Sequence, residues 1–167
     1  LVGSEMCIRD SADRCLAVDE SGNLVDGDYL IAICANDMKQ RGVLKKNAVV
    51  GTIMTNMGFN KFCEENDMHF VSTKVGDRYV LENMREHGYN IGGEQSGHVI
   101  FLDDNTTGDG LLSALHLLEV MVKTKKTLSE LASVMEVLPQ ALVNAKVPNH
   151  KKDNFMDYQE IADAVAK

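Results

Sequence analysis

Hydrophobic and polar positions along the chain follow two periods in turn, one typical of strands and one typical of helices. Short apolar runs, most of them rich in β-branched residues, predict strands at 14–18, 48–54, 69–73, 89–91, 99–102 and 141–147. Apolar residues that recur every three or four positions predict helices at 28–41, 59–66, 77–87, 109–122, 127–136 and 155–166. We expect Asp28 to cap the first helix and Gly88 to end the third. Strands that alternate with helices of this length predict an α/β fold, in which a mixed and mostly parallel sheet is sandwiched by helices.

Composition predicts a globular protein and argues against two classes of partner. The chain has 167 residues, of which 44% are hydrophobic, and this predicts a packed core. Lys and Arg number 17 against 25 Asp and Glu, and the resulting charge of −8 repels phosphate backbones, so we expect no nucleic acid partner. The longest strongly apolar run, 111–122, contains Ser113, His116 and Glu119 and is too short to cross a membrane.

The first residues and the cysteines together predict a cytoplasmic location. Residues 1–10 lack the basic end and the apolar stretch of a secretory signal. The four cysteines, Cys7, Cys15, Cys34 and Cys63, have no Cys-x-x-Cys spacing and stand in apolar surroundings. We therefore expect reduced, buried thiols and no zinc site.

The segment 92–98, Gly-Gly-Glu-Gln-Ser-Gly-His, is the strongest candidate for a binding site. Its three glycines allow a sharp turn, while Glu94, Ser96 and His98 alternate in direction and can face one side. A carboxylate, a hydroxyl and an imidazole that converge suit a ligand with several hydroxyl groups. The glycine pattern by itself favours a plainer alternative, a tight hairpin whose polar residues face water.

Two further segments carry charge next to predicted helix starts. Residues 73–78 join a strand to a helix, where backbone N–H groups together with Lys74 and Arg78 can face an anion. A capped helix with solvated basic residues is the favoured interpretation of that segment. Residues 103–109 are rich in carboxylates but lack the ligand spacing of a calcium loop, which favours a solvated loop and an N-cap.

The sequence Gly-Glu-Gln-Ser-Gly-His at 93–98 resembles the sugar-binding loop of the α-D-phosphohexomutases. Its glutamine resembles the version found in bacterial members that act on hexosamine phosphates. Further segments that resemble the family, in the family's order, lie at 13–20, 25–28, 75–80 and 107–110. The resemblance covers roughly residues 12–167 and implies membership of this family.

The resemblance implies a parent enzyme of four domains, of which this chain is a piece. Residues 12–24 are expected to end the metal-binding second domain, and 25–138 to form the sugar-binding third domain. Residues 139–167 are expected to begin a truncated fourth domain. Residues 1–11 do not match the family, and we expect a non-native, poorly ordered lead there.

In that family a phosphoserine of the first domain exchanges its phosphoryl group with a sugar phosphate. The positions that the resemblance assigns to the site are Arg14, Asp77, Arg78, Glu94, Ser96 and His98. Of these, Glu94 and Ser96 are expected to hydrogen-bond the sugar hydroxyls, whereas His98 and Arg14 are expected near the reacting phosphate as catalytic residues. Asp77 and Arg78 are expected to line the same cleft. The phosphoserine segment is missing, so we expect the isolated chain to be inactive.

The magnesium loop of the family, Asp-Gly-Asp-Ala-Asp-Arg, is only partly present. Its last three residues align with 12–14, which leaves Asp13 as the one carboxylate ligand. Arg9 and Ser11 stand where the other two carboxylates belong. Without those oxygen ligands, Mg2+, which is expected in the parent enzyme, should bind this chain weakly or not at all.

The activity that the resemblance implies is the interconversion of glucosamine 6-phosphate and glucosamine 1-phosphate, on the route to amino-sugar nucleotides for the cell wall. Such phosphoryl transfer needs a positioned sugar and cationic groups around the phosphate. Three alternatives stay open: a parent that acts on a neutral hexose phosphate, a non-catalytic module that binds sugar phosphates, and a purely structural α/β domain.

Overall fold

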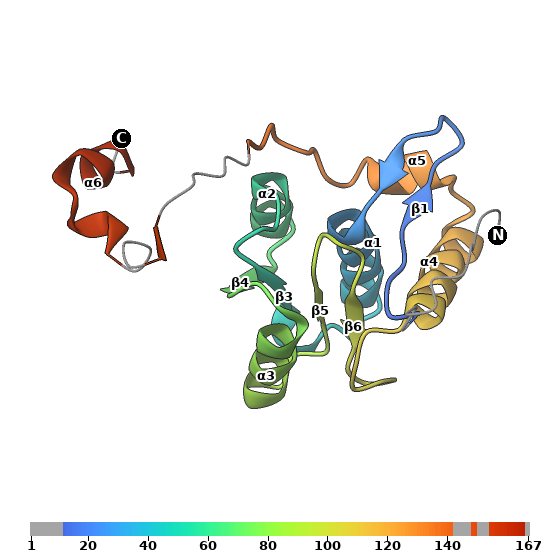
Figure 1. The fold of residues 1–167 in the computed structure, drawn as a ribbon. Helices are drawn as coiled ribbons and strands as arrows, with labels where there is room; N and C mark the ends of the chain where they lie inside the picture. Colours follow the sequence, from blue (N-terminus) through green and yellow to red (C-terminus); the bar gives the residue numbers. More distant parts are fainter. Residues whose placement is uncertain (1–11, 142–147, 150–153, 166–167) are drawn as a thin grey trace.

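The computed structural model describes residues 12–141, 148–149 and 154–165, and it has the α/β architecture that the residue pattern predicts (Figure 1). The elements in chain order are β1 (Ala17–Val18), β2 (Leu24–Val25), α1 (Gly27–Gln40), η1 (Lys45–Asn47), β3 (Ala48–Thr52), α2 (Met57–Glu65), β4 (His69–Thr73), α3 (Asp77–His87), β5 (Ile91–Gly93), β6 (Val99–Phe101), α4 (Gly110–Thr124), α5 (Leu128–Ala132), η3 (Phe155–Asp157) and α6 (Gln159–Val165). Most of the strand predicted at 141–147, and the whole of the lead at 1–11, lie outside the described residues.

A four-stranded sheet in the order β4-β3-β5-β6 forms the centre of the fold. β3 pairs in parallel with β4, where Val50 lies opposite Val71, and in parallel with β5, where Val50 lies opposite Gly92. β5 and β6 form an antiparallel hairpin in which Gly92 lies opposite Ile100. The sheet is therefore mixed and mostly parallel, as expected. β1 and β2 form a separate short antiparallel pair.

Helices cover both faces of the sheet because successive strand residues point to opposite sides. On β3, Val49 belongs to the larger core, to which α1, α2, α4 and α5 contribute. Its neighbour Val50 belongs to a smaller core, where it packs with Val80 and Met84 of α3. The side chains of both cores are buried, so the apolar residues of the predicted strands and helices pack on both sides of the sheet.

Helix ends follow local chemistry, but several differ from the prediction: α2 begins at Met57 and not at 59, and α5 ends at Ala132 and not at 136. α3 has the predicted bounds and ends at Gly88, whose φ of 69° lies in the left-handed region that glycine adopts readily. Asp109 caps α4 by accepting from the N–H of Leu112. The expectation that Asp28 caps α1 is wrong, because Asp26 is the N-cap and its side chain accepts from the N–H groups of Asp28 and Tyr29.

Asp28 is instead a buried carboxylate in the first turn of α1. Its side chain is only 1% exposed, and Oδ2 accepts from the N–H of Asn56 at 2.9 Å. Oδ1 has no hydrogen-bond partner among the residues that the structure describes. Burial excludes the water that would solvate a charge and raises the pKa of the Asp28 carboxyl to about 6.

Asn56 connects Asp28 to the segment through which the chain leaves the domain. Its Oδ1 accepts from the N–H of Gly58 at the start of α2, and also from the N–H of Leu138. Its Nδ2 donates to the carbonyl of Leu138 at 2.9 Å. One buried side chain thus holds both backbone groups of Leu138, 82 residues further along the chain.

The elements after Leu138 are described only in part. η3 and α6 contact each other within the region where a helix is predicted at 155–166. Within the described ranges, none of the helices has the length and hydropathy that crossing a membrane requires.

The substitution Asp28→Asn should change the pH dependence of stability. The pKa of Asp28 is higher in the folded chain than the ordinary 3.8, so the fold loses stability as the pH rises from about 3.8 to about 6, and the loss levels off above that. The variant lacks this cost. Its free energy of unfolding, measured by urea denaturation, should rise relative to the original chain by about 2 kcal/mol between pH 4 and pH 7.

The control for this prediction is Asp67→Asn, an exposed carboxylate beyond α2. Its difference from the original chain should stay constant over the same pH range. A constant difference for Asp28→Asn as well would contradict the interpretation of Asp28 as a buried ionisable group.

Candidate functional site

The candidate site is built on residues 94–98, the loop that joins β5 to β6. The loop is closed by two backbone hydrogen bonds, from the N–H of Glu94 to the carbonyl of His98 and from the N–H of Gly97 to the carbonyl of Glu94. Gly97 has a φ of 91°, which favours glycine at the tip of this turn. The predicted hairpin is therefore present, and the side chain of Glu94 has a hydrogen-bond partner outside it.

The start of α1 packs directly against this loop. The N–H of Gly27 donates to the carbonyl of Gln95 at 2.9 Å. A Cβ at Gly27 would lie 2.0 Å from the carbonyl oxygen of Glu94 and 2.8 Å from the nitrogen of Gly97, distances that no side chain can occupy. Glycine is needed at this position because two backbones meet there without a side chain between them.

Glu94 is held by the N-terminal end of α3. Its Oε1 accepts from the N–H of Gly76 at 2.9 Å, and the side chain is half-buried. Gly76 has a φ of 131°, a conformation that side chains rarely adopt, so glycine permits this N–H to face the loop. The anion that the segment 73–78 binds in this structure is therefore the carboxylate of Glu94, and the helix dipole stabilises it.

His98 lies buried between two carboxylates. Its ring is 3% exposed, and Nε2 stands 3.8 Å from Oδ2 of Asp13 and 3.9 Å from Oδ2 of Asp77. Both separations exceed the length of a hydrogen bond. Nδ1 is buried without a hydrogen-bond partner among the described residues.

Gly108 sets the position of the His98 ring. A Cβ at Gly108 would lie 2.4 Å from Nε2 and 2.6 Å from both Cδ2 and Cε1 of the imidazole. The ring thus lies directly against the backbone of the segment that leads into α4. Any side chain at this position would have to displace the imidazole.

Residues 12–15 run beside the loop and bring Asp13 to it. The N–H of Cys15 donates to the carbonyl of Gly97 at 3.0 Å, and the N–H of Gly110 donates to the carbonyl of Ala12 at 2.7 Å. These bonds fix the segment on both sides of Asp13. The site therefore joins three parts of the chain that are far apart in sequence, and it unites Asp13, Asp77, Glu94 and His98.

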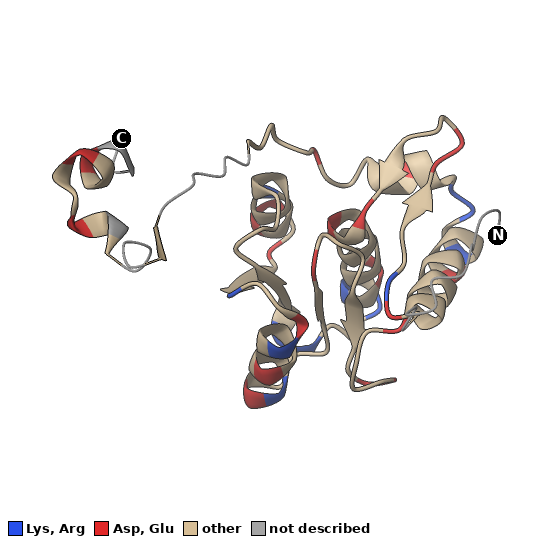
Figure 2. Cartoon of the chain, in the orientation of Figure 1, with Lys and Arg blue, Asp and Glu red and all other residues tan. Residues whose placement is uncertain are grey.

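The other predicted site residues have different surroundings. The Nε of Arg78 donates to Oε1 of Glu82 at 2.7 Å along the exposed surface of α3, which carries charges of both signs (Figure 2). Ser96 is exposed at the tip of the loop, and Arg14 is exposed next to Asp13. Only Arg78 is engaged with a partner away from the loop.

Sequence reasoning missed Gly27, Gly76 and Gly108, which shape the site through the absence of a side chain. Gly108 lies within the predicted loop 103–109, and Gly27 precedes a predicted helix, so each could be read as ordinary turn or cap chemistry. The signal that distinguishes them is a close approach of two backbones, and such an approach is visible only in three dimensions.

The described residues do not form a magnesium site. Within the described ranges, no group of three or more His, Cys, Asp or Glu side chains is arranged to hold a metal ion. Asp13 is the one carboxylate of the family's loop that the described residues contain, while Arg9 and Ser11 lie outside them. A single carboxylate does not fit the six oxygen ligands that Mg2+ prefers.

Residues 26–138 match the family model of phosphoglucomutase/phosphomannomutase, alpha/beta/alpha domain III, and the chain belongs to this family. Within it, the chain is 56% identical over 156 residues to the phosphoglucosamine mutases of Clostridium acetobutylicum and Caldanaerobacter subterraneus. Each alignment covers 93% of this chain and 35% of the relative, so the chain spans about a third of the length of these curated relatives.

Solved structures of the same superfamily share the fold. The Aspergillus fumigatus N-acetylphosphoglucosamine mutase in complex with GlcNAc-6P and magnesium superposes with a TM-score of 0.65 at 22% identity, over 81% of this chain and 36% of that one. A phosphoglucomutase/phosphomannomutase family protein from Burkholderia thailandensis gives a TM-score of 0.66 at 23% identity, over 78% of this chain and 28% of that one. At these identities the likeness concerns the fold alone.

The substitution Gly108→Ala should displace His98. The added methyl would stand 2.4 Å from Nε2, so the ring or the backbone must move, and overpacking of this kind costs about 1–3 kcal/mol. We expect a lower free energy of unfolding in urea and shifted imidazole proton signals of His98 in NMR spectra.

Gly42→Ala serves as the matched control, because Gly42 has a positive φ but nothing within 4 Å of the added Cβ. It should lower stability through backbone strain and leave the His98 signals in place. Unmoved His98 signals in Gly108→Ala would show that the ring is not fixed by this contact.

Proposed function

We propose that this chain is the sugar-binding part of a longer phosphoglucosamine mutase, an isomerase that interconverts glucosamine 6-phosphate and glucosamine 1-phosphate. The observation that carries the proposal is the meeting of Asp13, Asp77, Glu94 and His98 at one loop. It gains weight from the 56% identity of the chain to phosphoglucosamine mutases over 93% of its length.

Glu94 and Ser96 are the proposed ligands of the sugar hydroxyls. Gly76 holds one carboxylate oxygen of Glu94, so the other can accept a hydrogen bond from a hydroxyl without the side chain having to be ordered first. Ser96 stands exposed at the tip of the loop, and its hydroxyl can both donate and accept. This pair suits a sugar that must present either its 1-oxygen or its 6-oxygen to the same phosphoserine.

His98 and Arg14 are the proposed groups at the reacting phosphate. Nε2 of His98 has no hydrogen-bond-length contact to Asp13 or Asp77, and we propose that it donates to a phosphate oxygen after the ring and the two carboxylates shift apart. Arg14 is exposed next to Asp13 and can add a positive charge, which phosphoryl transfer needs around the equatorial oxygens of the transferred group. Asp77 is proposed to line the cleft, and Arg78 would join it only after leaving Glu82.

The longer protein supplies the parts of the proposed reaction that this chain lacks. We propose that residues 12–24 end its second domain, that 25–138 form its third domain, and that 139–167 begin its fourth. The phosphoserine that exchanges a phosphoryl group with the sugar belongs to its first domain. The role of Mg2+ in such enzymes is assigned to the longer protein, and no step of the proposal depends on a metal held by this chain.

A cytoplasmic location is part of the proposal. Cys15, Cys34 and Cys63 carry thiols that are not joined in disulfides. Burial raises the pKa of both Cys34 and Cys63 to about 12, which keeps these thiols protonated and unreactive. Such thiols suit a reducing compartment.

The test of the proposed activity is turnover by the longer protein, with Glu94→Gln as the decisive variant. Loss of the carboxylate charge should lower kcat/KM for glucosamine 6-phosphate about 10- to 100-fold, because a hydrogen bond to a charged group contributes about 1.5–3 kcal/mol. A coupled assay for the product measures this change.

Glu86→Gln is the control, an exposed glutamate on α3 whose substitution should leave kcat/KM within about twofold, as expected for a surface position. Equal turnover of Glu94→Gln and the original protein would remove Glu94 from the site. Preference for glucose or mannose phosphates over glucosamine phosphates would overturn the proposed substrate and favour the neutral-hexose alternative.

The 167-residue chain alone should bind glucosamine 6-phosphate weakly and show no turnover. It contributes only part of the contacts that a four-domain enzyme makes, so we expect a Kd of about 1 mM or more in calorimetry. Micromolar affinity would instead identify the chain as an independent sugar-phosphate-binding module.

A further inference from the structure

α4 carries an apolar face that the described part of the chain leaves exposed. Leu111, Leu115, Leu118 and Val122 are 71%, 55%, 52% and 76% exposed, and they recur every three or four residues on one side of the helix. Few charged residues interrupt α4 (Figure 2). A face of this kind normally packs against another element.

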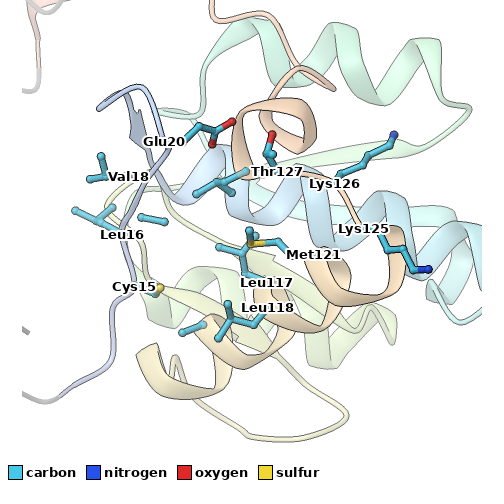
Figure 3. A pocket seen from close by; sticks show the side chains of 13 residues that line it. Cys15, Leu16, Val18, Glu20, Leu117, Leu118, Met121, Lys125, Lys126 and Thr127 are labelled. Atoms are coloured by element: carbon cyan, nitrogen blue, oxygen red, sulfur yellow. The ribbon is translucent and has the colours of Figure 1, made fainter.

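A groove of about 690 Å³ adjoins this face. Its walls are α4 and the segment 15–18, and the side chains of Leu117, Leu118 and Met121 line it from the helix (Figure 3). Lys125, Lys126 and Glu20 stand at its edge. The lining is mostly apolar, which suits an apolar protein segment more than a sugar phosphate.

The starts of α1 and α4 share the same local arrangement, and this similarity indicates what packs against the apolar face of α4. Asp26 and Asp109 are both N-caps, and each is followed by a glycine that begins a long helix, α1 or α4. Gly27 donates its N–H to Gln95 in one loop, and Gly110 donates its N–H to Ala12 in the other segment.

Backbone contact at the two glycines is equally close. A Cβ would meet a backbone oxygen at 2.0 Å at Gly27 and at 2.2 Å at Gly110. The two helices thus begin in the same way, each against the hairpin segment that precedes the other helix.

Placing Gly110 on Gly27 equates the exposed face of α4 with a buried face of α1. Val122 falls on the partly buried Lys39. The equivalents of Leu111, Leu115 and Leu118 are, in order, Asp28, Ala32 and Ala35. These three residues of α1 are 1%, 0% and 0% exposed, and α1 contacts both β5 and β6. The side of α1 that is buried in this domain therefore corresponds to the side of α4 that is open.

The strand segments that precede the two helices differ in exposure in the same way. All three residues of β6, the strand that leads toward α4, are buried. In the segment that leads toward α1, Leu16 and Val18 are 54% and 62% exposed. Among the described residues, α1 therefore packs against a sheet, whereas the apolar face of α4 has no sheet against it.

We propose that the apolar face of α4 and the adjoining groove are the docking surface for the β-sheet of the domain that precedes residue 12 in the longer protein. α4 then completes that domain as α1 completes this one, and the two domains exchange helices. The inference rests on the proposal that the chain is part of a longer mutase, whose relatives are almost three times its length. Its partner is an apolar sheet face, and Ala12 already lies against the start of α4.

Cysteine labelling of Leu118→Cys tests this proposal. In the 167-residue chain the introduced thiol should react readily with a maleimide, because the position is 52% exposed. In the longer protein the sheet should cover it, and the rate, followed by peptide mass spectrometry, should fall at least about tenfold. Val43→Cys, at a position 45% exposed between α1 and β3, is the control and should react equally in both proteins.

Equal labelling of Leu118→Cys in both proteins would overturn the proposal. Slow labelling already in the 167-residue chain would also overturn it, and if that protection grows with protein concentration, a second copy of the chain is the occupant. Turnover of glucosamine 6-phosphate is measured on the same longer protein. Protection without turnover would refute the proposed function and retain the docking surface, whereas turnover without protection would do the reverse.

The double substitution Leu115→Glu with Leu118→Glu gives a second, independent measurement. Charges buried under a sheet should lower the Tm of the longer protein by at least about 5 °C, while the 167-residue chain should change by less than about 2 °C. Val43→Glu should be neutral in both. An equal shift of Tm in the two proteins would contradict the proposed interface.

Discussion

The close approach of two backbones at Gly27 is the constraint on which the rest of the structure depends. α1 can donate its first N–H to Gln95 only because no side chain separates the helix from the loop. The contact turns the positive end of the helix dipole toward the loop, and the loop in turn fixes the backbone of Glu94 and His98. Gly108 repeats the principle at the imidazole ring. The site is therefore shaped as much by missing side chains as by the polar groups that line it.

Much of the fold is predictable from the residue pattern, because the spacing of apolar residues and the residues that begin and end each element indicate the same bounds. The strand β4 and the helix α3 have their predicted bounds, since a β-branched run precedes a clear helical period that Gly88 ends. The cap of α1 is not predictable in this way, because Asp26 and Asp28 are chemically equal candidates two residues apart. Asp28 is buried and accepts from Asn56, 28 residues away, so Asp26 is left as the cap. The similarity between the starts of α1 and α4 is equally hard to predict, because it lies in backbone contacts and the two segments share few residue types.

The candidate site is predictable in its loop and not in its surroundings. Glycine spacing and alternation place Glu94 and His98 on a hairpin, and the resemblance to a family names their roles. The contact of Glu94 with Gly76 depends on where α3 begins in space. Arg78 illustrates the limit, because a cation four residues before Glu82 on a helix has a local partner that competes with a distant ligand. Local charge patterns therefore need to be considered before a basic residue is assigned to a cleft.

The N–H and the carbonyl of Leu138 are both held by Asn56, whose side chain also caps α2. The backbone N–H of Asn56 donates to the buried carboxylate of Asp28 in the first turn of α1. A single residue therefore ties the starts of two helices to a backbone position 82 residues further along the chain. Loss of the Asn56 side-chain amide would leave Gly58 and both backbone groups of Leu138 without their partners, so its cost would be that of three hydrogen bonds and not of one.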